Sequence, residues 1–173
     1  MEPPKPPART LQKRLSIKSP ATAVWKALTD AAELVRWFPT SAEIDPRPGG
    51  AYRFRFESAQ SPEKSHDRAG HFLEVVPPKR VSFAWHAPLA GAAPDTVAPE
   101  TRVEFALVEK AGMTDVVLTH TGFGYGAEWD RSFESHAEGW GFFVMNLRSY
   151  LERGVDTRAR DLGLNAPQAA EEF

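Results

Sequence analysis

Imidazole and carboxylate side chains are the groups in this chain that could transfer protons, because burial can move the pKa of either toward neutrality. Glu74 has the same two-residue phase as Phe72 in a predicted strand and is expected to point inward, and His120 ends another predicted strand. Neither has a recognisable nucleophile near it. The sequence therefore assigns no catalytic residue, and His120 and Glu74 are only the candidates to test.

The sequence contains no motif for a metal site, a reactive thiol or a nucleotide-binding site. The chain has no Cys, which excludes disulfides, thiolate nucleophiles and cysteine-ligated metal sites. No His-x-His or His-x-x-x-His pair occurs, and the glycines at 122, 124 and 126 do not match the dinucleotide fingerprint. Neither Gly-x-Ser-x-Gly nor a phosphate-binding Gly-x-x-x-x-Gly-Lys sequence is present. We predict no metal and no cofactor.

Composition limits the class of partner. Among 173 residues, 21 Lys and Arg stand against 23 Asp and Glu, and no basic run offers the footprint that nucleic-acid binding needs. No apolar run approaches the roughly 20 residues of a spanning helix. We therefore expect a cytoplasmic protein that neither binds nucleic acid nor inserts into membranes. Aromatic residues make up 11% of the chain, and their placement is the main question.

Local patterns divide the chain into an N-terminal arm, one domain and a tail. Residues 1–9 are Pro-rich and predict an extended arm, residues 10–154 form the domain, and residues 155–173 predict a loosely ordered tail. A strand is expected over 10–17. Ser19 is then expected to cap a helix with Pro20 in its first turn, and Asp30 with Glu33 forms a capping-box pattern for a second short helix.

The middle of the chain alternates with a period of two. Tyr52, Phe54 and Phe56 alternate with charged residues, which predicts a strand with one packed face and one wet face. Further strands are expected over 42–45, 66–76, 80–86, 101–109 and 114–121, with loops at 58–65 and 87–99. A long helix is predicted from about 131 to 153, with Asp130 as its cap and Gly154 as its stop. The role of the 87–99 loop is open.

These elements predict an α+β fold in which an antiparallel sheet of six or seven strands wraps around the long C-terminal helix. An ordered series of motifs resembles the bacterial AHSA-type proteins of the SRPBCC (START-like) superfamily, which are similar to the C-terminal domain of the activator of the heat-shock protein 90 ATPase. The motifs that carry the resemblance are Val24-Trp25-Lys26-Ala27-Leu28-Thr29-Asp30, Trp37-Phe38-Pro39, Pro48-Gly49-Gly50-x-Tyr52-x-Phe54, Val81-x-Phe83-x-Trp85, Thr119-His120-Thr121-Gly122-Phe123 and His136-x-x-Gly139-Trp140. The resemblance covers roughly residues 11–153. It implies the helix-grip fold, which often leaves a hydrophobic cavity between sheet and helix.

The inward phase of the rings predicts the lining of such a cavity. Packing of the same rings into a core, or a groove for a partner, would use the same pattern. The predicted ligand-binding residues are Trp37, Phe38, Tyr52, Phe54, Phe56, Phe72, Phe83, Trp85, Phe105, His120, Phe123, Trp140, Phe143, Val144 and Leu147.

Three functions are compatible with this fold. The leading hypothesis is a protein that binds a small hydrophobic molecule, such as a lipid or an aromatic polyketide. We expect it to be a binding protein rather than an enzyme. The first alternative, implied by the resemblance, is a chaperone partner in the stress response that activates a heat-shock protein 90 ATPase. The second is a polyketide cyclase- or hydrolase-like enzyme. A monomer or a homodimer would suit each of them.

Overall fold

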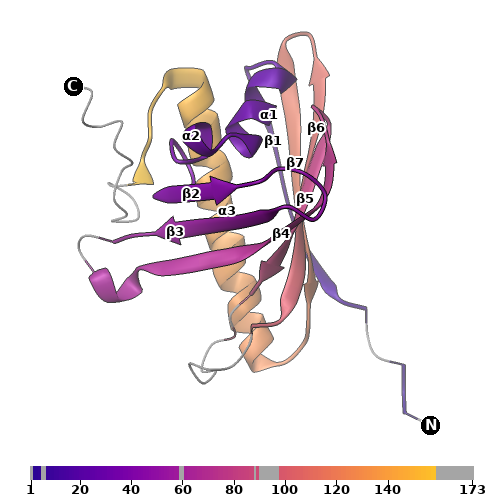
Figure 1. The fold of residues 1–173 in the computed structure, drawn as a ribbon. Coiled ribbons are helices and arrows are strands. Elements are labelled where there is room, and N and C mark those ends of the chain that lie inside the picture. The colour runs from indigo at the N-terminus through magenta and orange to yellow at the C-terminus, as the bar shows by residue number, and fades with distance from the viewer. Residues whose placement is uncertain (1, 5–6, 59–60, 88, 90–97, 159–173) are drawn as a thin grey trace.

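A seven-stranded antiparallel sheet curves around one long C-terminal helix (Figure 1). The structure is a computed structural model that describes residues 2–4, 7–58, 61–87, 89 and 98–158. Its elements are, in chain order, β1 (Arg9–Ile17), α1 (Ala21–Thr29), α2 (Ala31–Leu34), β2 (Ser41–Ile44), β3 (Ala51–Phe56), the 3-10 turn η1 (Pro62–Lys64), β4 (His66–Val76), β5 (Arg80–His86), β6 (Glu100–Lys110), β7 (Met113–Phe123) and α3 (Ala127–Arg153).

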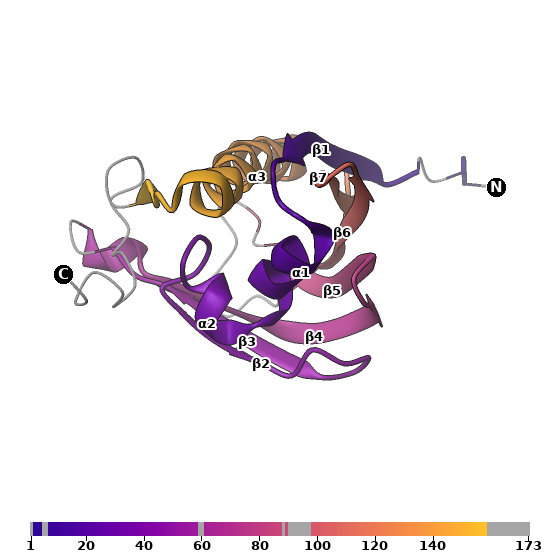
Figure 2. The ribbon, with the colours of Figure 1, turned by 90° about the horizontal axis from the view of Figure 1, so that it is seen from above.

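The sheet order is β1-β7-β6-β5-β4-β3-β2. Each strand from β2 to β6 pairs with the strand that follows it in the chain, and β1 pairs with β7. Seen from above, the sheet bends from β2 at one edge to β1 at the other, with all three helices on its concave side (Figure 2). This arrangement confirms the predicted α+β helix-grip fold.

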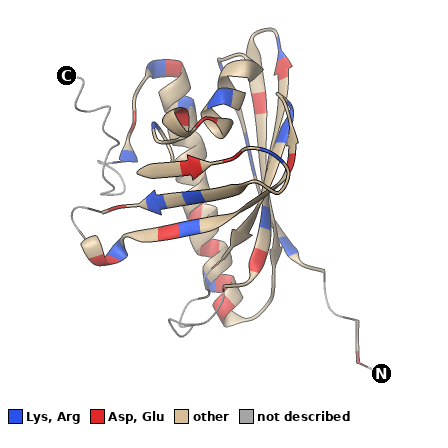
Figure 3. Ribbon diagram, viewed as in Figure 1, with Lys and Arg blue, Asp and Glu red and all other residues tan. Residues whose placement is uncertain are grey.

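Strand β3 follows its sequence pattern closely. Tyr52, Phe54 and Phe56 are buried, whereas Arg53 and Arg55 point outward and both form ion pairs with Asp67 of β4. Because side chains alternate between the two faces of a strand, the rings enter the core and the charges remain in solvent. Acidic and basic residues are interspersed over the strands and helices of the molecule (Figure 3).

Two helix boundaries agree with the sequence. The Asp30 side chain accepts a hydrogen bond from the backbone N–H of Glu33 at 3.1 Å, as a capping residue does. Gly154 ends α3 in the left-handed conformation with φ of 67°, and its N–H donates to the carbonyl of Tyr150.

Two predicted caps are wrong. Pro20, not Ser19, occupies the cap position of α1, and no side chain caps that helix. Helix α3 begins at Ala127, so Asp130 lies in its first turn and forms an ion pair with Arg9 at 2.7 Å. A carboxylate in the first turn is favourable because of the helix dipole.

The predicted inward orientation of Glu74 is also wrong. The register between β4 and β5 shifts between Phe72 and Glu74, so counting by two from Phe72 fails there. Glu74 lies on the outer side of the sheet, where it forms ion pairs with Arg80 and Arg102. The hydrogen bond from Arg80 lowers the pKa of the Glu74 carboxyl.

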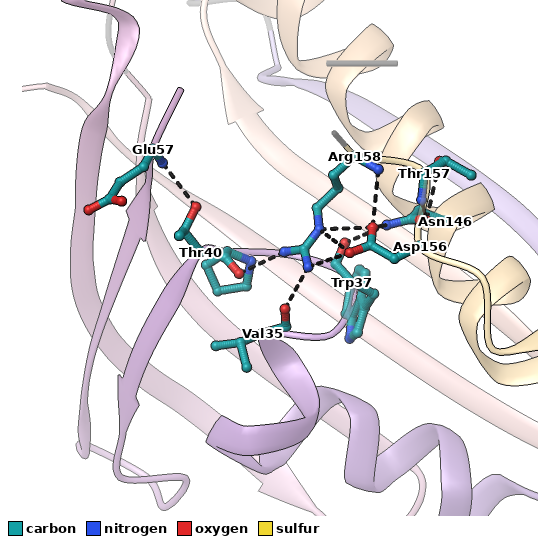
Figure 4. Close-up of polar contacts among 9 residues, drawn as sticks. Val35, Trp37, Thr40, Glu57, Asn146, Asp156, Thr157 and Arg158 are labelled. Carbon is teal, nitrogen blue, oxygen red and sulfur yellow. Dashed lines mark hydrogen bonds and ion pairs between the residues drawn. The ribbon is translucent and has the colours of Figure 1, made fainter. Parts of the chain in front are cut away.

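The residues after α3 form a clip rather than a loose tail over 155–158 (Figure 4). Arg158 is fully buried and donates to the backbone carbonyls of Val35 and Pro39 at 2.6 and 2.7 Å. Its guanidinium also forms an ion pair with Asp156, and Asn146 of α3 donates to that carboxylate. The clip fastens the end of α3 to the segment that carries Phe38. Residues 159–173 lie outside the described part of the chain.

The predicted loops fall partly outside the described residues as well. Within 58–65 the structure describes Ser58 and residues 61–65, which include the turn η1. Within 87–99 it describes residues 87, 89, 98 and 99. Of the N-terminal arm, Pro7 accepts a hydrogen bond from the Tyr125 hydroxyl, and Arg9 is already part of β1.

Candidate functional site

A cavity of about 540 Å³ opens between the concave face of the sheet and α3. Its walls come from β3, the turn η1, the first half of β4, the end of β5 and the first two-thirds of α3. The lining residues are Phe38, Phe56, Ser58, Lys64, His66, Arg68, Trp85, Leu89, Arg131, Ser132, Ser135, His136, Gly139, Trp140 and Phe143.

The structure brings five of the fifteen predicted ligand-binding residues together on this wall, and these are Phe38, Phe56, Trp85, Trp140 and Phe143. The remaining ten lie in the packed core behind the wall, and these are Trp37, Tyr52, Phe54, Phe72, Phe83, Phe105, His120, Phe123, Val144 and Leu147. The predicted aromatic residues thus fall into two groups, one that fills the core and one that faces the cavity.

Phe38 lies at the junction of core and cavity. Its ring is 5.3 Å or less, centroid to centroid, from the rings of Trp37, Phe56, Trp140 and Phe143. These pairs adopt edge-on or near-parallel geometries, which favour aromatic contact. Because Phe38 lies between Val35 and Pro39, whose carbonyls accept from Arg158, the clip also holds this part of the cavity wall.

Two tryptophans of the wall are oriented by histidines. Trp85 donates from Nε1 to Nε2 of His136 at 3.1 Å, and Nδ1 of His136 lies 2.7 Å from the carbonyl of Ser132. A neutral imidazole has one donor and one acceptor nitrogen. We therefore assign the proton to Nδ1, where His136 donates to its own helix.

The second pair lies deeper. Trp140 donates from Nε1 to Nδ1 of His120 at 3.0 Å, and Nε2 of His120 lies 2.6 Å from the Thr101 hydroxyl. Thr101 in turn donates to the carbonyl of Trp85 at 2.6 Å. This chain is consistent only if His120 is protonated at Nε2 and donates to Thr101.

Both histidines are held neutral. Burial, together with a smaller contribution from the neighbouring His136, lowers the pKa of His120 to about 3. Burial likewise lowers the pKa of His136. Every ring nitrogen of the pair has a protein partner, so their role in this arrangement is to orient Trp85 and Trp140. The structure does not bring His120 and Glu74 together for acid–base chemistry.

Polar residues of the wall were missed by the sequence analysis. Arg68, His66 and Lys64 face the cavity from the β4 side, and Arg131 with Ser132 and Ser135 faces it from α3. The signal was available for β4, because counting back by two from Phe72 places Gly70, Arg68 and His66 on the inner face. No such pattern marked Arg131.

Other site chemistry is sparse in the part of the chain that the structure describes. No cluster of three His, Asp or Glu side chains there could hold a metal ion. Within the described residues, no helix combines the length and apolarity needed to cross a bilayer. The cavity wall offers rings and cations rather than a catalytic constellation.

Comparison with known proteins places the chain in a family. The family described as "Activator of Hsp90 ATPase homolog 1-like protein" matches residues 18–152, which span all the elements from α1 to most of α3. The chain belongs to this family. The expected resemblance to AHSA-type SRPBCC proteins is thereby confirmed. No curated protein matches the chain.

Several solved structures share the fold of this family member. Protein MLL2253 from Mesorhizobium loti is 22% identical, with a TM-score of 0.68 over 85% of this chain and 99% of its own. CalU16 from Micromonospora echinospora is 24% identical, with a TM-score of 0.64 over 85% of this chain and 76% of its own. The Aha1 dimer from Colwellia psychrerythraea is 23% identical, with a TM-score of 0.64 over 84% of this chain and 98% of its own. At these identities the likeness concerns the fold alone.

Proposed function

We propose that this member of the family binds a small, largely apolar molecule in the cavity between the sheet and α3. The observation that carries the proposal is the 540 Å³ cavity lined by Phe38, Phe56, Trp85, Trp140 and Phe143. Cavities of about 300–1,000 Å³ with aromatic walls and a few polar groups are typical of small-molecule sites.

The rigidity of the wall supports binding. Trp85 and Trp140 are each fixed by a hydrogen bond to a neutral histidine, and Phe38 is fixed by its ring neighbours. A preorganised wall loses little conformational entropy when a ligand enters. Each ring can therefore contribute most of its buried area to affinity.

Filling part of the cavity should weaken binding without harming the fold. Gly139 lines the cavity, and a Cβ added there would meet no atom within 4 Å. We expect Gly139→Leu to fold normally, because leucine also favours the helix over glycine. It should weaken binding of the neutral fluorophore N-phenyl-1-naphthylamine by roughly tenfold or more, as overpacking a site does. Fluorescence titration measures the affinity, and thermal denaturation checks the fold.

Gly141→Leu is the matched control. It lies on the same helix two residues away, does not line the cavity, and its new Cβ would meet only the side chain of Lys13 at 3.7 Å or more. Affinity should stay at the wild-type value in this variant. Equal binding by both variants, or no binding by the wild-type protein, would contradict the proposed function.

A second candidate function, activation of a heat-shock protein 90 ATPase, is favoured by the family to which the chain belongs. It would use an outer surface rather than the cavity. ATP turnover by the chaperone of the same organism should then rise on addition of this protein, and Gly139→Leu should raise it equally. Unchanged turnover would remove this candidate.

A further inference from the structure

Arg68 faces into the cavity rather than into solvent. In the β3–β4 ladder it lies directly opposite Phe54, and directly opposed residues project from the same face of a sheet. Phe54 is buried in the core, so the register directs Arg68 toward the concave side. Its guanidinium lies 6.0 Å from the centroid of the Trp85 ring and forms part of the cavity lining.

This guanidinium has no counter-ion among the described residues. Its one hydrogen bond there runs from Nη1 to the backbone carbonyl of Asp67 at 3.1 Å. The Nε atom is enclosed and has no hydrogen-bond partner in the structure. Burial lowers the pKa of Arg68, as expected when a charged group loses water. The guanidinium thus keeps hydrogen-bonding capacity that no described residue uses.

Arg9 is a second arginine whose interactions can be compared with those of Arg68. Arg9 forms an ion pair with Asp130, donates to the carbonyl of Gly124, and lies about 5 Å from the ring centroids of Tyr125 and Phe133, although its Nη2, like Nε of Arg68, has no hydrogen-bond partner. A buried cation is normally compensated in this way. Arg68 has a backbone carbonyl and the Trp85 ring as neighbours, but no ion pair within the part of the chain that the structure describes.

The charge around the cavity has one sign. Lys64, Arg68 and Arg131 line it, and none of the described lining residues is Asp or Glu. The protein as a whole carries a formal charge of −2, and its charged residues are otherwise interspersed (Figure 3). The cavity is therefore a local cationic site with aromatic walls.

We propose that the ligand is an amphipathic carboxylate, with its apolar body against the aromatic wall and its carboxylate held by the guanidinium of Arg68. This inference rests on the proposed function and names the ligand class for the same cavity. Lys64 and Arg131 add positive charge near the carboxylate. A charge-assisted hydrogen bond in a partly dry site gives both affinity and orientation.

The test compares two probes that differ in charge, 2-naphthoate and 2-naphthalenemethanol, by calorimetric titration. The wild-type protein should bind the carboxylate roughly tenfold more tightly than the alcohol or better, as hydrogen bonds to charged groups imply. Arg68→Met should remove this preference and leave the affinity for the alcohol unchanged. Arg14→Met, which removes an exposed charge on β1, is the control with the same change in net charge and should keep the preference.

The melting temperature of the ligand-free protein separates binding from structure. Arg68→Met should melt at the wild-type temperature or higher, because the variant removes a partly buried charge that has no ion pair among the described residues. A lower melting temperature with an unchanged preference for the carboxylate would overturn the proposal in favour of a structural role. Binding of both probes with equal affinity by the wild-type protein would overturn this inference alone, whereas binding of neither probe and no binding of N-phenyl-1-naphthylamine would overturn the proposed function too.

Discussion

Replacing Arg158 by alanine should lower the free energy of unfolding by about 3–5 kcal/mol, the usual cost of removing one partner of a buried ion pair. The substitution leaves the carbonyls of Val35 and Pro39 without their donor and leaves Asp156 without its cation. Burial opposes ionisation of Asp156, but the hydrogen bonds from Arg158 and Asn146 together lower its pKa. Without Arg158, the balance turns against the charged carboxylate.

Urea denaturation measures this loss, provided that the m-value stays constant. For a chain of this length, the melting temperature should fall by roughly 10 °C. Arg153→Ala is the control, because Arg153 is exposed at the end of α3 and its side chain donates, among the described residues, to Ser149 alone. If both variants lost the same free energy, the clip would not carry the stability assigned to it. Wild-type stability of Arg158→Ala would contradict the prediction directly.

The second large effect is a loss of stability on mild acidification, between pH 6.5 and 5. An unfolded histidine titrates near 6.5, whereas burial keeps the pKa of His120 at about 3 in the folded protein. Below pH 6.5 the unfolded state therefore binds more protons than the folded state, and the free energy of unfolding falls with pH. The slope is about 1.4 kcal/mol per pH unit for each such group. His120 alone should account for roughly 2 kcal/mol between pH 6.5 and 5, and His136 adds to it in the same direction.

The window from pH 6.5 to 5 isolates the histidines, because unfolded carboxyl groups titrate near 4. His120→Gln is the matched variant, since its amide can accept from Trp140 and donate to Thr101 but cannot take up a proton. Its stability should fall less steeply with acidification than that of the wild-type protein. Parallel pH profiles for the two proteins would show that His120 is not the responsible group.

Local sequence determined much of the architecture. The alternation of Tyr52, Phe54 and Phe56 with charged residues defined β3 and its buried face, and Asp30 and Gly154 marked helix boundaries that the structure has. Each of these features depends on residues close together in the chain, such as a side chain that caps its own helix. The ordered motifs along the chain were enough to indicate the family and hence the fold.

Tertiary structure decided the orientation of Glu74 and Arg68. Side-chain alternation counted from Phe72 predicts the wrong face of the sheet for Glu74, because the register shifts between these two residues. The same alternation predicts the correct face for Arg68. A shift of register depends on the neighbouring strand, so the strand's own residues do not reveal it. The case for Arg68 depends on its register, its unpartnered Nε and its position in the cavity wall together.

The sequence by itself determined the elements, the aromatic inner face of the sheet and the family. Only the tertiary structure decided which rings fill the core and which line the cavity, which histidines orient Trp85 and Trp140, and where Arg158 docks. The physical reason is that alternation and capping are short-range effects. Hydrogen bonds, ion pairs and ring contacts join residues far apart in the chain, as Arg158 and Pro39, which are 119 positions apart. Which of these residues meet depends on how the sheet bends around α3.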